Sequence, residues 1–116
     1  MIGIVSVGAP VPRYRLSART LAAVWGGGGG SGERAVAGYD EDSLTMACDA
    51  ALDAVHGCDV SRIGACFFAS TTAPYLEKSS ATLLAAVADL DPDTLTADFE
   101  ARSGAAPPRC GWPSTR

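Results

Sequence analysis

The sequence predicts an α/β fold, because short apolar segments of strand length alternate with stretches of helical periodicity. Three segments have strand character and lie at residues 2–7, 63–70 and 95–99. Helical stretches lie between them at residues 44–56 and 79–90. This βαβαβ order favours right-handed crossovers and a parallel sheet with helices packed against it.

The first predicted strand, residues 2–7, is rich in β-branched residues and ends at Gly8 and Pro10, which is typical of a strand buried on both faces. Ser17 predicts a short helix that runs to Trp25, because its hydroxyl can accept from the free amides of a first helical turn. A run of glycines then ends that helix.

The glycine-rich loop contains the pattern GxGxxG at Gly27, Gly29 and Gly32. A dinucleotide-binding loop follows a strand and opens a helix, whereas this loop follows a helix and the next predicted helix begins near Asp42. No GK[ST] sequence follows the glycines either. The loop is therefore not expected to bind phosphate.

The most regular helix, residues 44–56, follows the sequence Asp-Glu-Asp-Ser at 40–43, whose carboxylates suit the positive end of a helix. Its apolar residues recur at helical spacing, namely Leu44, Ala47, Ala51, Leu52 and Val55. The strand at 63–70 ends in a Thr-Thr-Ala-Pro turn, and Asp91-Pro92 breaks the helix at 79–90 before the third strand.

The composition limits the class of protein. The chain of 116 residues, 47% hydrophobic and 19% charged, suits one soluble domain and has no apolar run of transmembrane length. A net charge of -4 and a pI near 4.7 argue against nucleic acid as a partner. The N-terminus lacks the basic lead and the cleavage site of a secretory signal, so a cytoplasmic protein is expected.

The metal-ligating residue types are few and scattered. The four cysteines, Cys48, Cys58, Cys66 and Cys110, have no metal-ligand spacing, and the single histidine, His56, falls in a helical stretch. Reduced structural thiols are therefore expected, and no metal site.

Residues 101–116 do not continue the α/β pattern, because three prolines exclude a regular element where the next helix is expected. A genuine disordered tail is one explanation, and a frameshift is the other. Read one base earlier, residues 106–115 permit Gly-Thr-Ser-Ala-Leu-Arg-Leu-Ala-Val-Asp, an amphipathic helical sequence. Loss of the central G from the codons TGC-CGG would also convert Cys-Arg into the observed Ser103-Gly104. The frameshift is the favoured hypothesis.

Several segments together resemble 3-hydroxy-3-methylglutaryl-CoA synthases over nearly all of residues 1–100. They are Gly3-Ile4-Val5, Val11-Pro12-Arg13-Tyr14-Arg15-Leu16, Trp25-Gly26, Asp40-Glu41-Asp42-Ser43 and Thr96-Ala97-Asp98-Phe99-Glu100. The likeness is closest to the archaeal and bacterial forms, and it extends more distantly to ketoacyl carrier-protein synthase III of the same thiolase-like superfamily. It implies a partial thiolase-like fold, with residues 1–100 as the N-terminal part of the domain and 101–116 as an irregular tail.

The resemblance implies an acyltransferase that condenses acetyl-CoA with acetoacetyl-CoA in the mevalonate pathway of isoprenoid biosynthesis. In that reaction a cysteine thiolate takes the acetyl group, a glutamate acts as general base and acid, and a later histidine positions the second substrate. The implied partners are an acyl-CoA substrate and, in the intact protein, a second subunit of a homodimer. No cofactor, membrane or nucleic acid is implied.

Two positions depart from the family pattern. The family glutamate lies in a Ser-Glu-Ser turn after the second strand, and the matching residues here are Ser70-Thr71-Thr72, so Thr71 stands where the base is expected. The nucleophilic cysteine is expected five residues after Asp98, where Ser103 stands, and the single-base repair would restore a thiol there. The catalytic residues are therefore unassigned, and the 116-residue chain is expected to be inactive.

Other residues near that turn have both a structural and a functional interpretation. Glu77 is the nearest alternative carboxylate, but a solvated charge beside Lys78 is the favoured interpretation. Pro74 and Tyr75 match the family's turn and are expected to shape the loop beside the site. Ser70 is expected to end the strand rather than to bind a ligand.

Three functional hypotheses follow. The first is an N-terminal fragment of an acyl-CoA condensing enzyme. The second is a non-catalytic thiolase-like subunit that binds acyl-CoA or a partner enzyme, which Thr71 favours and which Ser103 also favours if the tail is genuine. The third is a free-standing nucleotide-binding α/β module, which the position of the glycine loop disfavours. Because three strands leave an edge and a face uncovered, the 116-residue chain is expected to aggregate or to be only partly structured.

Overall fold

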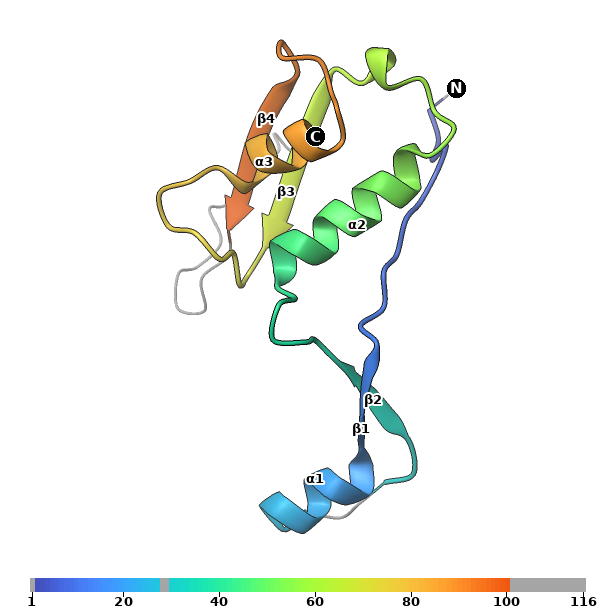
Figure 1. Cartoon of the computed structure of the whole chain (residues 1–116), viewed down its shortest axis with the longest axis vertical. Helices are drawn as coiled ribbons and strands as arrows, with labels where there is room; N and C mark the ends of the chain where they lie inside the picture. Colours follow the sequence, from blue (N-terminus) through green and yellow to red (C-terminus); the bar gives the residue numbers. More distant parts are fainter. Residues whose placement is uncertain (1, 28–29, 101–116) are drawn as a thin grey trace, which may run out of the picture.

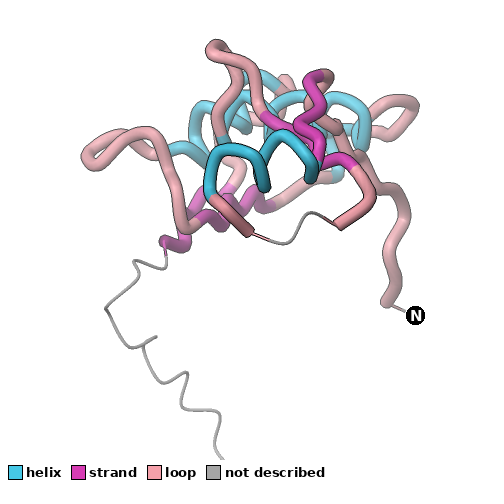
Figure 2. Tube along the Cα trace, turned by 90° about the horizontal axis from the view of Figure 1, so that it is seen from below, coloured by secondary structure: helices cyan, strands magenta, loops and turns pink. Residues whose placement is uncertain are grey.

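The computed structural model describes residues 2–27 and 30–100 (Figure 1). The elements in chain order are β1 (Tyr14–Ser17), α1 (Ala18–Trp25), β2 (Glu33–Val36), α2 (Ser43–Val55), the 3-10 turn η1 (Val60–Arg62), β3 (Ala65–Ser70), α3 (Ser80–Val87) and β4 (Leu95–Glu100). Loops make up a large part of the chain, and the strands are short (Figure 2). The predicted α/β class is confirmed.

The centre of the fold is a parallel pair of strands covered by two helices on one face. β3 and β4 pair in parallel from Ala65 opposite Leu95 to Ser70 opposite Glu100. α2 and α3 contact each other, and α3 packs on both strands. Because the strands are parallel, their carboxyl ends meet at one edge of the sheet (Figure 1).

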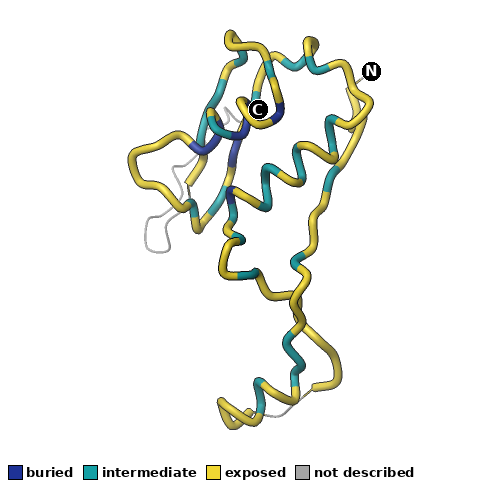
Figure 3. The backbone as a smooth tube through the Cα atoms, in the orientation of Figure 1, coloured by how far each residue is buried: buried dark blue, intermediate teal, exposed yellow. Residues whose placement is uncertain are grey.

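The core lies between that sheet and the helices. Phe68 of β3 is 4% exposed and packs with Leu44 of α2 and Ala81 of α3. Buried residues cluster at the contact of β3 with the two helices (Figure 3). Small side chains at Ala81 and Ala85 let α3 lie close to the sheet.

The opposite face of the sheet is apolar but open to solvent. It carries the alternate residues of both strands, namely Ala65, Phe67, Ala69, Leu95, Ala97 and Phe99. The side chains of Phe67, Leu95 and Phe99 are 57%, 62% and 58% exposed. The rings of Phe67 and Phe99 meet edge to face, with centroids 5.8 Å apart. We call these six residues the outer face; within the described ranges no helix covers it.

α1 and α2 begin at caps that the sequence predicts. Ser17 Oγ accepts from the Thr20 amide at 3.0 Å. Asp42 Oδ1 accepts from the amides of Leu44 and Thr45, and the Thr45 hydroxyl completes a capping box. α1 ends at Gly26, whose φ of 71° is the left-handed conformation that glycine favours.

The first predicted strand is wrong. Residues 2–7 pair with no strand in the described part of the chain, and Ile2, Val5 and Val7 are 103%, 92% and 74% exposed. The segment then passes so close to α2 at Gly8 that an added Cβ would overlap the Ala50 carbonyl. A β-branched sequence forms a strand only when a neighbour supplies a backbone ladder, and the β3–β4 pair does not extend to it. Of the five elements of the predicted βαβαβ unit, the described residues therefore form only the last four.

The structure contains a short antiparallel strand pair that the sequence does not predict. β1 and β2 pair from Tyr14 opposite Val36 to Ser17 opposite Glu33. α1 and the glycine-rich loop lie between the two strands, and the Ala18 amide donates to the Gly32 carbonyl at 2.9 Å. This unit stands apart from the β3–β4 layer (Figure 1). The loop is thus followed by a strand, which supports its exclusion as a dinucleotide-binding loop.

Candidate active site

The candidate site lies where β3 and β4 end. Their last residues, Ser70 and Glu100, are register partners, so both strands end at the same edge of the sheet. In parallel α/β sheets, ligands bind outside the carboxyl ends of strands. Thr71 is the first residue after β3 and lies at this edge. Ser103, the predicted cysteine position, falls outside the described residues.

One hydrogen bond within the turn and one to α2 hold the turn that follows β3. The Thr72 amide donates to Ser70 Oγ at 3.0 Å, which closes the turn. Ser43 Oγ, in the first turn of α2, donates to the Thr72 carbonyl at 2.8 Å. The Ser70 hydroxyl thus serves the turn, as the sequence predicts. Thr71 is exposed between these anchored neighbours.

Acidic side chains line a depression beside this turn. The depression has a volume of about 410 Å³, and Glu77, Asp98 and Glu100 contribute to its wall. Glu77 is exposed, and Lys78 beside it places its ammonium group 5.2 Å from the centroid of the Tyr75 ring. Lys78 also contributes to the wall, so the fold brings both Glu77 and Lys78 to the edge at which β4 ends.

Asp98 joins β4 to the start of α3. Its Oδ2 accepts from the Ser80 amide at 2.9 Å, and its Oδ1 accepts from the Ala81 amide at 2.7 Å. These amides are among those that a helix leaves without intrahelical partners. In the sequence, Asp98 serves only as the reference position from which the expected nucleophile is located, and nothing there predicts its contact with α3.

The described thiols near the core are poor nucleophiles. Burial raises the pKa of the Cys66 thiol, and the negative charge of Asp98 raises it further. Burial also raises the pKa of the Cys48 thiol, with Asp49 as the next cause. A thiolate is the reactive form, so neither cysteine suits acyl transfer. Cys110 lies outside the described residues.

Alkylation tests how the reactivities of these thiols compare. The experiment uses the folded whole protein, by which we mean the full-length protein of which the 116-residue chain is expected to be the N-terminal part. Of the three described thiols, Cys58 is expected to react first with iodoacetamide at pH 8 because it is exposed, whereas Cys48 and Cys66 are half-buried and have raised pKa values. The rates at Cys48 and Cys66 are expected to rise as the pH increases toward 10, because more thiolate then forms. Peptide mass spectrometry measures each site. Faster labelling of Cys66 than of Cys58 at pH 8 would contradict the prediction.

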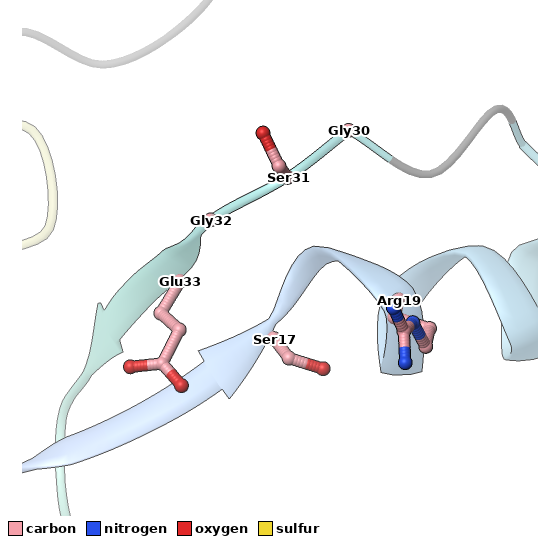
Figure 4. Close-up of a pocket in the computed structure, with 6 residues that line it drawn as sticks. All are labelled: Ser17, Arg19, Gly30, Ser31, Gly32 and Glu33. Carbon is pink, nitrogen blue, oxygen red and sulfur yellow. The ribbon is translucent and has the colours of Figure 1, made fainter.

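A second depression lies beside α1. It measures about 330 Å³ and is lined by Ser17 and Arg19 at the start of α1 and by Ser31 and Glu33 after the glycine-rich loop (Figure 4). Its lining holds one cationic and one anionic side chain, Arg19 and Glu33, so the depression offers no net positive charge to a phosphate.

The described residues offer no preformed metal centre. His56 is exposed at the C-terminal end of α2, and no group of three or more His, Cys, Asp or Glu gathers in the described ranges. None of the helices described is long and apolar enough to cross a bilayer.

Comparisons with known proteins agree with the resemblance seen in the sequence. No family model matches the chain. It is 42% identical over 102 residues to hydroxymethylglutaryl-CoA synthase from Thermococcus gammatolerans, covering 85% of this chain and 29% of that protein. The enzyme of the same name from Methanopyrus kandleri is 41% identical over 108 residues, covering 85% of this chain and 31% of that protein. The chain thus spans about a third of the length of these relatives.

Solved structures show the same fold. β-Ketoacyl-[acyl carrier protein] synthase III from Thermus thermophilus matches with a TM-score of 0.71 and 25% identity, over 86% of this chain and 33% of that one. OleA from Xanthomonas campestri matches with a TM-score of 0.70 and 18% identity, over 82% of this chain and 34% of that one. The predicted partial thiolase-like fold is therefore confirmed.

Proposed function

Because the chain belongs to the hydroxymethylglutaryl-CoA synthase family of thiolase-like condensing enzymes, we propose that it is part of an acyl-CoA condensing enzyme. The observation that carries the proposal is the identity of about 40% with hydroxymethylglutaryl-CoA synthases over 85% of the chain. The edge formed by Ser70 and Glu100 supports it, because the two positions expected to carry the base and the nucleophile both follow this edge.

The proposed chemistry is condensation of acetyl-CoA with acetoacetyl-CoA. A thiolate at the position of Ser103 would take the acetyl group with release of CoA, and a general base would then remove a proton from the acetyl methyl group. The resulting enolate carbon would attack the ketone carbon of acetoacetyl-CoA. Water would release the product from the thiol. We further propose a cytoplasmic homodimer as the working form.

A non-catalytic acyl-CoA-binding subunit is the second candidate. Thr71 favours it, because an exposed neutral hydroxyl cannot remove the proton that a glutamate would remove. Glu77 is the carboxylate that could compensate, since it lines the depression at the same edge. The two candidates differ in whether the protein becomes acetylated.

Incubation of the whole protein with acetyl-CoA separates these candidates. A condensing enzyme is expected to gain one acetyl group by mass spectrometry and to release free CoA faster once acetoacetyl-CoA is added. The 116-residue chain, tested in parallel, is expected to gain none, because Ser103 replaces the thiol. Binding of acyl-CoA by calorimetry without acetylation would establish the subunit role and reject the enzyme.

The tail bears on the nucleophile. We propose that residues 101–116 arise from a one-base deletion, which makes Ser103 a cysteine in the original frame. Resequencing the gene after the codon for Glu100 is expected to restore Cys-Arg and an amphipathic helix. An unbroken frame with no coding sequence in the neighbouring frame would establish a genuine tail.

A further inference from the structure

We propose that Asp98 is a positioning residue, which ties the start of α3 to β4 and thereby fixes the end of β4, the strand that precedes the position expected to carry the nucleophile. This inference rests on the proposed function for its catalytic consequence. Its structural part rests on the described hydrogen bonds alone.

Asp98 binds α3 with both carboxylate oxygens. Oδ2 accepts from Ser80 and Oδ1 accepts from Ala81, at 2.9 and 2.7 Å. Those two residues are 1% and 0% exposed, so water cannot easily take the place of the carboxylate. The negative charge also lies at the positive end of the helix. Since both oxygens are engaged by backbone amides, Asp98 is suited to hold structure rather than to remove a proton.

Helix capping alone does not account for this arrangement. α3 already has its own cap, because Ser79 Oγ accepts from the Thr82 amide at 3.2 Å. Asp98 satisfies different amides and comes from another element, 17 and 18 residues along the chain. The contact is therefore a tether between α3 and β4.

The tether closes a ring around the candidate site. Asp98 pairs in register with Phe68, and each residue lies two positions before the end of its strand, at Glu100 and Ser70. From Ser70 the chain passes through Thr71 and the following loop into α3. The hydrogen bonds of the Asp98 carboxylate then link the start of α3 to β4. Loosening this one contact would let the loop and the end of β4 move relative to each other.

The test compares Asp98→Asn with Thr96→Val in the whole protein. Both substitutions preserve side-chain shape on the inner face of β4, and both remove a contact with α3, because Thr96 Oγ1 lies 3.1 Å from Thr82 Oγ1. Of these two residues, only Asp98 is charged, and only Asp98 lies near the carboxyl end of β4. The melting temperature of each variant shows how much of an effect is due to a general loss of stability.

Two readouts separate positioning from chemistry. The first is hydrogen–deuterium exchange in the peptide that contains Phe99, Glu100 and the residues after them. Exchange in this peptide is expected to increase in Asp98→Asn but not in Thr96→Val. The rate of acetylation by saturating acetyl-CoA is expected to fall about 10²-fold in Asp98→Asn only, because small misplacements of a reacting group have effects of this size. The KM for acetyl-CoA is expected to change little, since Asp98 does not contact substrate in this scheme.

The outcomes are distinguishable. If the wild-type protein is not acetylated but exchange rises only in Asp98→Asn, the positioning role stands and the proposed function fails. If exchange at the end of β4 is the same in both variants, the positioning role is overturned whatever the activity. If exchange rises only in Asp98→Asn but acetylation falls equally in both, the catalytic consequence is overturned.

Discussion

Replacing Thr71 with glutamate in the whole protein is expected to raise the rate of condensation by about 10²- to 10⁴-fold, the usual contribution of a well-placed general base. Thr71 follows the last residue of β3, and the hydrogen bonds of Ser70 and Thr72 fix the backbone on both sides of it. It is exposed, so a longer side chain can be accommodated. Release of CoA in the presence of both substrates measures the rate.

Thr71→Gln is the matched control for this prediction. Glutamine has nearly the size and shape of glutamate but cannot accept the proton as a carboxylate does. Only Thr71→Glu is therefore expected to increase the rate, and its activity should depend on a group that titrates in the acidic range. Equal rates in both variants would show that Thr71 does not occupy the position of the base. A wild-type rate that falls strongly on Glu77→Gln would assign that role to Glu77.

The helices and the strands of the parallel pair could be predicted because their signals are local. Ser17 and Asp42 are cap residues placed directly before helical stretches, and both cap their helices in the structure. The apolar run that becomes β3 is bounded by a turn sequence. Each of these signals acts within one turn or one strand, so the sequence alone is sufficient to locate them.

The two errors concern strand pairing, which is not local. Residues 2–7 have the composition of a buried strand, yet no described neighbour pairs with them. Conversely, β1 and β2 form a strand pair although both are short and mostly exposed. In the sequence they are separated by α1 and the glycine-rich loop. Composition reports the fit of a side chain to a sheet, but it does not report where the partner strand comes from.

The same distinction applies to the site. The order of motifs placed Thr71 after the second strand of the predicted unit, and β3 ends directly before it. The contact of Asp98 with Ser80 and Ala81 depends on how α3 crosses the sheet, which sequence periodicity does not specify. A usable signal was nonetheless present, because an acidic residue inside an otherwise apolar strand must find a partner.

Phe67→Ala is expected to have opposite consequences in the 116-residue chain and in the whole protein. Phe67 and Phe68 are neighbours in β3, but they are 57% and 4% exposed. In the short chain, Phe67→Ala removes part of the exposed outer face, so aggregation and binding of an apolar dye are expected to decrease. In the whole protein it is expected to lower the free energy of unfolding by about 3–5 kcal/mol, because further chain would bury that ring. Light scattering and denaturant unfolding measure the two effects.

Phe68→Ala is the control, because it removes a core ring from the contact with Leu44 and Ala81 in both forms and should destabilise both.

The reason to expect a cover on the outer face is topological. α3 connects β3 to β4 across the inner face, and a right-handed connection across the opposite face would carry the chain from β4 back past β3. A helix following β4 would then lie on Phe67, Leu95 and Phe99, which form the apolar surface that such a helix requires. Sharp cooperative unfolding of the 116-residue chain, together with no effect of Phe67→Ala in the whole protein, would show that the outer face needs no cover.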